Sequence, residues 1–132
     1  MATLQLRSER KTQLIDVTAA VRDVAERSPG AAVVLFVPHT TAGLVTQASG
    51  AGATHVAADV ESAFERLVDE DASYEHLDEG DRNPWSHIRA ALTSSSLTIP
   101  LVDGRLALSD LQAIFFCEFD GPRDRTLLVT VV

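Results

Sequence analysis

The chain has 132 residues, and 45% of them are hydrophobic, which is enough to bury the core of one domain without a disulfide or a metal as a staple. Its formal net charge of −8 argues against nucleic acid as a partner, because the chain repels phosphate backbones. It has one cysteine, no apolar run near the roughly 20 residues of a membrane helix and no apolar signal segment at its start, so we expect a cytoplasmic protein without a membrane partner.

The first quarter of the chain predicts two strands and a helix. Residues 3–7 alternate polar and apolar side chains as a half-buried strand does, and residues 12–17 are expected to be their antiparallel partner. A helix is expected over residues 18–28, capped by Asp16 or Thr18.

The next segments predict a buried strand and a longer helix. Residues 31–37 form a continuous apolar run rich in valine, which indicates a central strand covered on both faces. Residues 43–47 are expected to form another strand. Thr54 is expected to cap a helix that runs to about residue 68 and packs an apolar stripe against the core.

The second half predicts one short helix and the remaining strands. Asn83 and Pro84 are a typical N-cap and first turn for a helix that ends near residue 92, with Trp85, Ile88 and Leu92 on its apolar face. The strands are expected over residues 97–102 and 105–108, joined by a hairpin turn at Asp103-Gly104, and over residues 112–119 and 126–132. About seven strands with two or three helices in mixed order indicate an α+β fold, which we expect to be one domain over residues 1–132.

His39 is the first candidate site residue. It follows the predicted strand 31–37, and the C-terminal ends of strands frequently carry binding residues. Thr40 and Thr41 come next and supply hydroxyl groups. The alternative is a histidine that only forms hydrogen bonds within a loop.

Two further histidines bracket a polar, turn-rich stretch. His76 lies among acidic residues, where a histidine is commonly just solvated, although a nearby carboxylate is able to orient a metal-bound imidazole. His87 lies off the apolar stripe of its helix, at roughly 100° per residue, so it faces either solvent or a site beside the sheet. Together with His39 they supply three imidazoles, and imidazoles are common ligands in divalent-metal and anion sites.

The last strands carry ionisable groups with more than one interpretation. Strand alternation puts Cys117 on the face of Phe115 and Phe119, which favours a buried, inert thiol over a nucleophile. Glu118 falls on the opposite face, where a carboxylate needs an arginine, a neighbouring subunit or a site as its partner. Arg123 and Arg125 are either phosphate ligands or surface charges.

Several motifs in order along the chain resemble the YjbQ-like family, whose members are also called secondary thiamine-phosphate synthase enzymes. They are Val37-Pro38-His39-Thr40-Thr41-Ala42-Gly43, Tyr74-Glu75-His76 with His87 eleven residues later, Leu97-Thr98-Ile99-Pro100, Asp103-Gly104-Arg105-Leu106, and the run from Gln112 to Arg123. The resemblance extends over nearly the whole chain.

The resemblance implies an α+β fold with a β-sandwich-like body, homotrimers that pack through their sheets, and a weak thiamine-phosphate synthase activity. That reaction joins an aminopyrimidine diphosphate to a thiazole phosphate and releases pyrophosphate. By the same resemblance, the catalytic residues are His39, His76 and His87, which would also hold an anion or a divalent metal such as zinc or magnesium. The expected ligands of a small phosphorylated metabolite are Thr40, Thr41, Asn83 and Arg123.

The sequence departs from the family pattern after Gly43. The family usually continues through Asn-Glu-Asn, and the corresponding positions here are Gln47, Ala48 and Ser49. Losing a glutamate removes an acid/base or metal-orienting group. Three hypotheses remain open: a weak transferase, a non-catalytic homotrimer that binds a metal or a phosphorylated metabolite, and a module in which only trimerisation matters.

Overall fold

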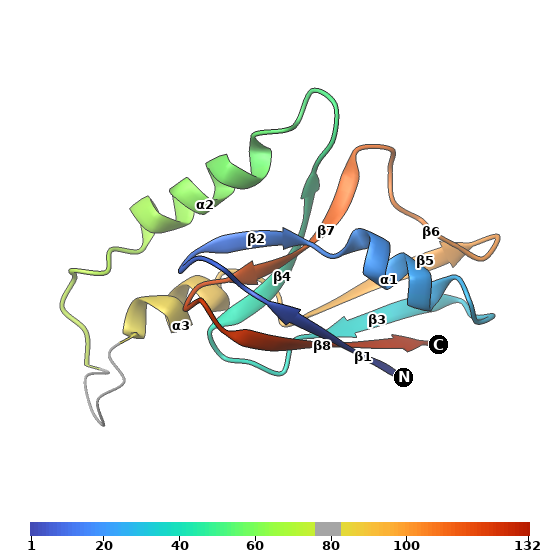
Figure 1. The fold of residues 1–132 in the computed structure, drawn as a ribbon, viewed down its shortest axis with the longest axis horizontal. Helices are drawn as coiled ribbons and strands as arrows, with labels where there is room; N and C mark the ends of the chain where they lie inside the picture. The colour runs from blue at the N-terminus through green and yellow to red at the C-terminus, as the bar shows by residue number, and fades with distance from the viewer. Residues whose placement is uncertain (76–82) are drawn as a thin grey trace.

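The computed structural model describes residues 1–75 and 83–132, and its strands form two antiparallel sheets packed face to face (Figure 1). In the five-stranded sheet the order is β1 (Ala2–Arg7), β8 (Asp124–Val131), β3 (Ala32–Phe36), β5 (Ser96–Val102) and β6 (Arg105–Leu106). In the three-stranded sheet the order is β2 (Gln13–Asp16), β7 (Gln112–Glu118) and β4 (Ala42–Ala48).

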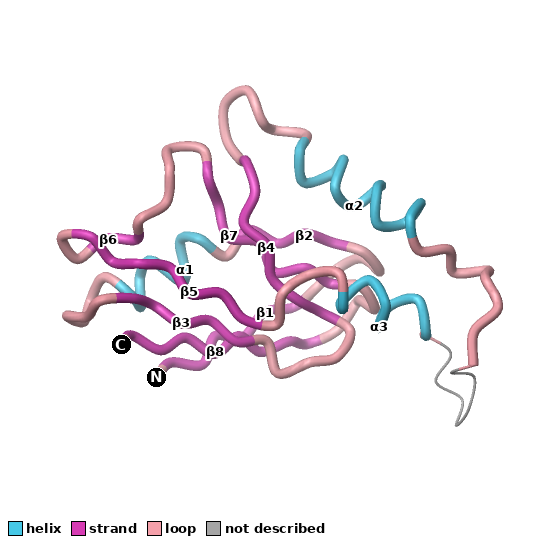
Figure 2. The backbone as a smooth tube through the Cα atoms, turned by 180° about the vertical axis from the view of Figure 1, so that it is seen from behind, coloured by secondary structure: helices cyan, strands magenta, loops and turns pink. Residues whose placement is uncertain are grey.

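Three helices accompany the sheets, and Figure 2 shows two of them on the side of the smaller sheet. These two are α2 (Val56–Leu67), which contacts β2 and β4, and α3 (Pro84–Ala91), which contacts β4. The third, α1 (Thr18–Ala25), contacts β6, β7 and β8. Within residues 1–75 and 83–132, eight strands and three helices in mixed order confirm the expected α+β fold.

The three-stranded sheet is the middle layer, because both of its faces are covered. Phe116 of β7 lies in the main core together with Leu35 of the larger sheet. Cys117 points to the other face, into a second cluster where the rings of Phe64 and Phe119 lie 5.0 Å apart. Burial on both faces explains why β7 is almost continuously apolar.

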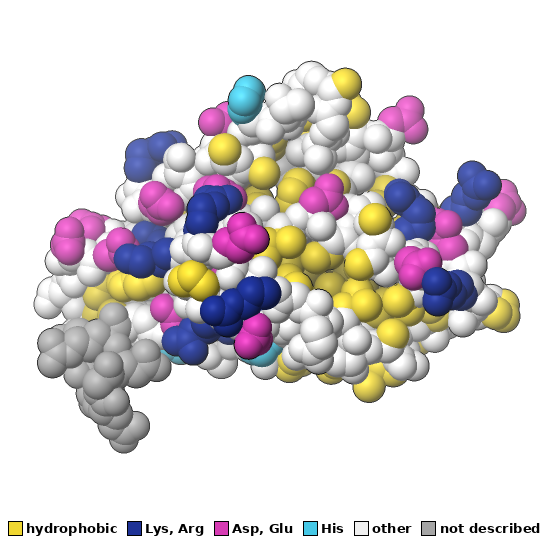
Figure 3. Space-filling model, in the orientation of Figure 1, with side chains coloured by type: hydrophobic (Ala, Val, Ile, Leu, Met, Phe, Trp, Pro, Cys, Tyr) yellow, Lys and Arg dark blue, Asp and Glu magenta, His cyan; other side chains and the backbone are white. Residues whose placement is uncertain are grey.

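The expected pairing of the first two strands is wrong. β1 pairs with β8, Leu4 opposite Leu127, whereas β2 pairs with β7, Leu14 opposite Cys117. Leu14 and Ile15 of β2 pack into different apolar clusters, so this strand needs cover on both faces and only the middle layer provides it. β1 and β2 each lie at one edge of their sheet, and Figure 3 shows hydrophobic surface in this region of the molecule.

The strand over residues 31–37 is central as expected, but it is covered on one face. Val33 and Leu35 of β3 are fully buried, whereas Phe36 is 44% exposed on the outer face. The apolar run predicted cover on both sides, and the described residues of the chain provide it on one.

The apolar face predicted for the helix after Asn83 is also wrong. Trp85 is buried, but Ile88 is 41% and Leu92 60% exposed, and the buried position one turn after Trp85 belongs to Arg89. The Arg89 guanidinium donates to the Val68 carbonyl at 2.7 Å and lies over the Trp85 ring at 5.0 Å. Hydrophobic periodicity cannot predict this buried face of the helix, because the second buried residue on it, Arg89, is charged.

Local signals mostly agree with the structure. Asp103 and Gly104 both adopt positive φ, as the predicted hairpin turn requires. Asp16 accepts the Thr18 N–H, although Val17 occupies the N-cap position of α1, and α2 starts after His55 instead of Thr54. None of the helices in the described ranges is long and apolar enough to cross a membrane.

Candidate functional site

A cavity of about 540 Å³ lies where β3 ends, β4 begins and α3 starts. Figures 1 and 2 both show the β3–β4 connection on the same side of the molecule as α3. We call it the His39 cavity. Its lining residues are Phe36, Val37, Pro38, His39, Thr40, Thr41, Asn83, His87, Ser95, Asp120, Arg123 and Arg125.

Most of the residues predicted from the sequence meet in this cavity. It contains His39, Thr40, Thr41, Asn83, His87 and Arg123. His76 lies outside the described residues, so the convergence of all three histidines stays a prediction. Sequence reasoning missed Ser95 and Asp120. For Asp120 the available signal was its position two residues after the strand that ends at Glu118.

Sheet register and one close contact bring these segments together. Ala42 at the start of β4 is opposite Glu118 at the end of β7, so the β3–β4 and β7–β8 connections lie at the same end of the sheets. Gly43 lets the end of α3 approach β4 closely, because a Cβ atom there would lie 1.8 Å from the Thr93 hydroxyl oxygen. The N-terminal end of α3 reaches the two connections as well, because Asn83 and His87 line the cavity together with residues of both.

Arg125 is held at the cavity by a buried network. Its Nε donates to Glu118 Oε1 at 2.8 Å, and its Nη2 donates to Glu118 Oε2 and, at 2.7 Å, to the Thr41 hydroxyl. The side chains of Arg125 and Glu118 are 5% and 0% exposed. Arg125 Nη1 donates to no residue that the structure describes, so this nitrogen remains for a ligand.

Glu118 is kept ionised behind the arginine. Its burial opposes ionisation, but hydrogen bonds from Arg125, from the Ser8 hydroxyl and from the Asp120 N–H outweigh that effect, and the pKa of Glu118 lies below its ordinary value. Glu118 therefore fixes Arg125 without lining the cavity itself. Arg125 is therefore the partner that Glu118 was expected to need at its position on the strand.

Asp120 organises the opposite wall. Its Oδ2 accepts from Asn83 Nδ2 at 2.7 Å and from Arg123 Nη2 at 2.8 Å, while its carbonyl accepts from Arg123 Nε at 2.9 Å. Arg123 is half exposed, so it is a more mobile cation than Arg125.

His39 lines the cavity, and its ring is neutral. Its Nε2 accepts the Thr126 N–H at 2.9 Å, so the proton of the neutral ring is on Nδ1. Burial and the neighbouring Arg125 hold the pKa of His39 below its ordinary value, which favours this neutral form.

The hydrogen bond to Thr126 makes His39 a poor metal ligand. A metal needs a lone pair on the ring nitrogen that it contacts, and Nδ1 has one only if the proton moves to Nε2, opposite the Thr126 N–H. Within residues 1–75 and 83–132, moreover, no group of three or more His, Cys, Asp or Glu side chains is arranged to hold a metal ion. The described residues therefore do not fit the zinc or magnesium expected from the resemblance.

The β3–β4 connection supplies backbone donors. The N–H groups of His39, Thr40 and Thr41 donate to no residue that the structure describes. Consecutive unpaired N–H groups in a loop are a common way to bind an anion. They lie in a segment that lines the cavity beside Arg125.

Two other predicted features lie at different places. His87 lines the His39 cavity and also a neighbouring cavity of about 620 Å³ that contains Tyr74 and Ile88. Cys117 is buried, and desolvation raises the pKa of its thiol to about 12, which confirms the interpretation of an inert cysteine.

The departure at residues 47–49 lies away from the His39 cavity, which His39 and His87 line. Ala48 ends β4 opposite Gln112, whereas the cavity is at the other end of that strand, roughly 20 Å away at the usual rise per residue. Gln47 and Ala48 line a separate cavity with Ser109 and Leu111. Within one chain, this replacement leaves the His39 cavity intact.

The fold and this cavity define a two-sheet α+β protein with an arginine-backed pocket at one end of its sheets. The model of the family described as UPF0047 protein YjbQ-like matches residues 2–132, so the chain belongs to that family and the expected resemblance is confirmed.

Relatives and solved structures of the family agree. A UPF0047 protein of Methanothermobacter thermautotrophicus is 38% identical over 130 residues, which cover 97% of this chain and 88% of that protein. The UPF0047 protein YugU of Bacillus subtilis is 31% identical, over 100% of this chain and 98% of that protein. A YjbQ/UPF0047 structure from Clostridium acetobutylicum superposes with a TM-score of 0.91 at 30% identity, and one from Thermus thermophilus with 0.87 at 32%, each covering 100% of both chains.

Proposed function

We propose that the His39 cavity binds the phosphate group of a phosphorylated small metabolite. The observation that carries this proposal is Arg125, a cation fixed by a buried carboxylate with its Nη1 left for a ligand. Arginine is the side chain best suited to hold phosphate, because its planar donors match the phosphate oxygens.

The other donors of the cavity fit the same ligand. His39 Nδ1–H is a neutral donor, the amides of residues 39–41 are unused by the described residues, and Arg123 adds a second cation. The chain as a whole carries a net charge of −8, so an anion needs such a local site. Glu118 pairs with Arg125 from outside the cavity, because it is not one of the lining residues.

The reaction that we propose is the weak thiamine-phosphate synthase-like transfer that the family resemblance implies. In that reaction a carbon–oxygen bond to the diphosphate breaks, the leaving pyrophosphate keeps the electron pair, and the thiazole nitrogen forms the new bond to carbon. Fixed donors stabilise the charge that develops on a leaving group. Arg125 and the loop amides would do this for a diphosphate in the cavity.

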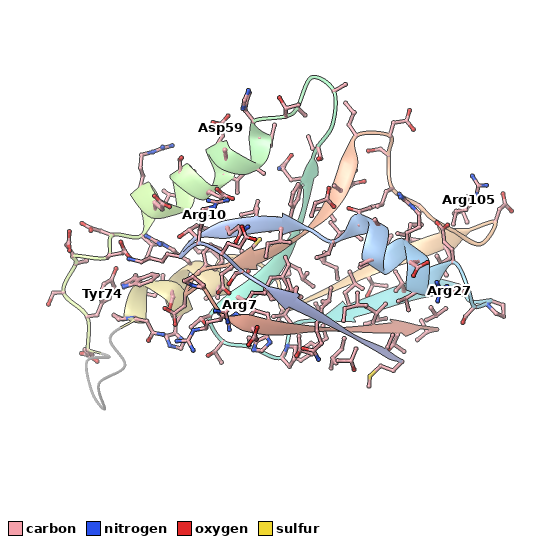
Figure 4. The ribbon with its side chains drawn as sticks, in the orientation of Figure 1. Arg7, Arg10, Arg27, Asp59, Tyr74 and Arg105 are labelled. Atoms are coloured by element: carbon pink, nitrogen blue, oxygen red, sulfur yellow. The ribbon has the colours of Figure 1, made fainter. Side chains whose placement is uncertain are left out.

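Calorimetric titration of the protein with pyrophosphate tests the binding step. The test variant is Arg125→Gln with Glu118→Gln, which removes both buried charges together and leaves no unpaired one. The control is Arg27→Gln, because Arg27 pairs with Asp23 on the surface and lies at the other end of the molecule from Tyr74 (Figure 4). We expect binding by the natural protein and the control and its loss in the double variant. Equal binding by all three proteins contradicts the proposal.

The second candidate function is binding without catalysis. The replacement of the family glutamate by Ala48 motivates it, because a glutamate is an acid/base candidate. Within one chain residue 48 lies roughly 20 Å from the His39 cavity, so this argument applies only where a neighbouring subunit brings residue 48 to the site. Thiamine phosphate formation at enzyme concentrations above those of the two substrates separates the two functions. If the natural protein forms product as fast as Ala48→Glu, the non-catalytic alternative is wrong.

We also propose, following the resemblance, that the protein is a homotrimer packed through its larger sheet. The outer face of this sheet exposes Phe36 and Val102, at 44% and 58%. Apolar side chains on a sheet face are typical of a surface that another subunit covers. Sedimentation equilibrium of the natural protein and of Val102→Asp tests this, and a monomeric natural protein contradicts it.

A further inference from the structure

Asn83 departs from the local rule for its position. It is the N-cap of α3, where an asparagine side chain usually accepts an N–H of the first turn, yet it forms no such hydrogen bond. Instead, its Nδ2 donates to Asp120 Oδ2 at 2.7 Å across the β7–β8 connection. The helix gives up this stabilisation, and the side chain is fixed at the His39 cavity.

The hydrogen bond to Asp120 determines which end of the amide is free. Turning the amide over would set its oxygen against the Asp120 carboxylate, so Nδ2 must face Asp120 and Oδ1 must be the other atom. Asn83 is 5% exposed, and its Oδ1 is buried without a hydrogen-bond partner among the described residues. A buried acceptor without a donor costs roughly 1–3 kcal/mol, so a donor from a ligand would remove a standing penalty.

Asp120 offers a second acceptor beside it. Both of its hydrogen bonds from side chains use Oδ2, and its Oδ1 accepts from no described residue. All four residues line the cavity: Arg125 and His39 as donors, and Asn83 and Asp120 with acceptors that no described residue uses. Asn83 Oδ1 is buried, so a donor of the ligand has to enter the wall of the cavity to reach it. The dianion of a simple alkyl phosphate satisfies the donors alone, because it brings no hydrogen to the acceptors, whereas the inorganic dianion HPO4²⁻ carries one.

We propose that the His39 cavity selects a phosphate ester whose organic part carries a hydroxyl or amino group, and that Asn83 Oδ1 accepts the hydrogen bond from this group. Asn83 is thus the residue that determines specificity, while Arg125 and the loop amides bind the phosphate. This inference rests on the proposed phosphate binding and names the class of ligand. A site that hydrogen-bonds such a group rejects the analogue that lacks it.

Three phosphate esters with the same three-carbon backbone, together with inorganic phosphate, separate the two levels of the proposal. Calorimetric titrations use inorganic phosphate, propyl phosphate, glycerol 3-phosphate and 3-aminopropyl phosphate with the natural protein. The test variant is Asn83→Ser, which keeps an N-capping side chain and removes the amide. The control is Leu92→Ala, because Leu92 lies at the C-cap of the same helix and is 60% exposed.

The expected result is a preference for a donor-bearing ester over propyl phosphate of roughly 2- to 10-fold, the range for one neutral hydrogen bond. We expect Asn83→Ser to lose this preference while it still binds propyl phosphate, and Leu92→Ala to retain it. Equal affinity of the natural protein for all three esters overturns the inference and leaves phosphate binding standing. A preference for the amine alone that persists in Asn83→Ser also overturns it, because attraction to Asp120 would then be the cause. No binding of any phosphate probe overturns the proposed function itself.

Discussion

Replacing Glu118 by Gln is expected to destabilise the protein strongly. The substitution keeps the shape of the side chain but leaves Arg125, whose side chain is 5% exposed, as a buried charge without a counter-ion. Removing one partner of a buried pair costs about 3–5 kcal/mol, a large part of the roughly 5–15 kcal/mol by which a domain is stable.

The double variant Glu118→Gln with Arg125→Gln provides the matched comparison. Two neutral amides retain hydrogen-bonding groups for Ser8 and Thr41 and bury no net charge. We expect it to recover more than half of the loss of Glu118→Gln, that is at least about 1.5–2.5 kcal/mol, and the coupling energy between the two positions exceeds this recovery by the loss that Arg125→Gln alone causes. Urea denaturation at pH 7 measures all four free energies of unfolding in the cycle.

The acid limb of the stability curve provides a second measurement. The folded-state pKa of Glu118 lies below its ordinary value of 4.5, so its contribution is present above pH 4.5 and is lost as the pH falls through the folded pKa. In Glu118→Gln this part of the acid dependence should disappear. If Glu118→Gln lowers the free energy of unfolding by less than about 1 kcal/mol, or if the two single losses simply add, the assigned role of the pair is wrong.

Three further predictions concern other positions. Gly43→Ala should lower the free energy of unfolding by about 1–3 kcal/mol, because the new Cβ would lie 1.8 Å from the Thr93 hydroxyl; an unchanged urea midpoint contradicts this. The folded-state pKa of His39 lies below its ordinary value of 6.5, so the stability it contributes is complete above pH 6.5 and is lost as the pH falls from there through the folded pKa. His39→Gln should therefore flatten the unfolding free energy in this range, and a curve parallel to that of the natural protein refutes the depressed pKa. Ala48→Glu should leave the affinity for pyrophosphate unchanged within about 2-fold, since Ala48 lines a different cavity; a larger change in calorimetry places residue 48 at the site.

Most secondary structure elements follow from local patterns, because alternation, valine-rich runs and turn residues act over a few positions. The hairpin at Asp103-Gly104 and the helix that begins after Asn83 are examples. The pairing of residues 12–17 was wrong because it depends on which layer buries Leu14 and Ile15, and adjacency along the chain does not contain this information. The face of α3 was wrong because a hydrophobic stripe cannot include Arg89.

The residues of the site were predictable from the sequence, but the hydrogen bonds and ion pairs between them were not. His39, Thr40 and Thr41 were found from a motif after a strand, and strand alternation showed that Glu118 needs a partner. The partner is Arg125, seven residues after Glu118. This pairing depends on the path of the β7–β8 connection. The hydrogen bond from Thr126 to His39, which disfavours a metal, joins residues 87 positions apart and has no local signal.

The central claim is that Arg125 contacts a bound phosphate, and arginine side-chain NMR tests it most directly. The Nε–H resonances of the natural protein are followed while phosphate is added. We predict that the signals of Arg125 and Arg123 shift together along one saturating curve, while the signal of the distant Arg27 stays in place. An unchanged Arg125 signal at saturation, or an equal shift of Arg27, contradicts the assignment of the His39 cavity as a phosphate site.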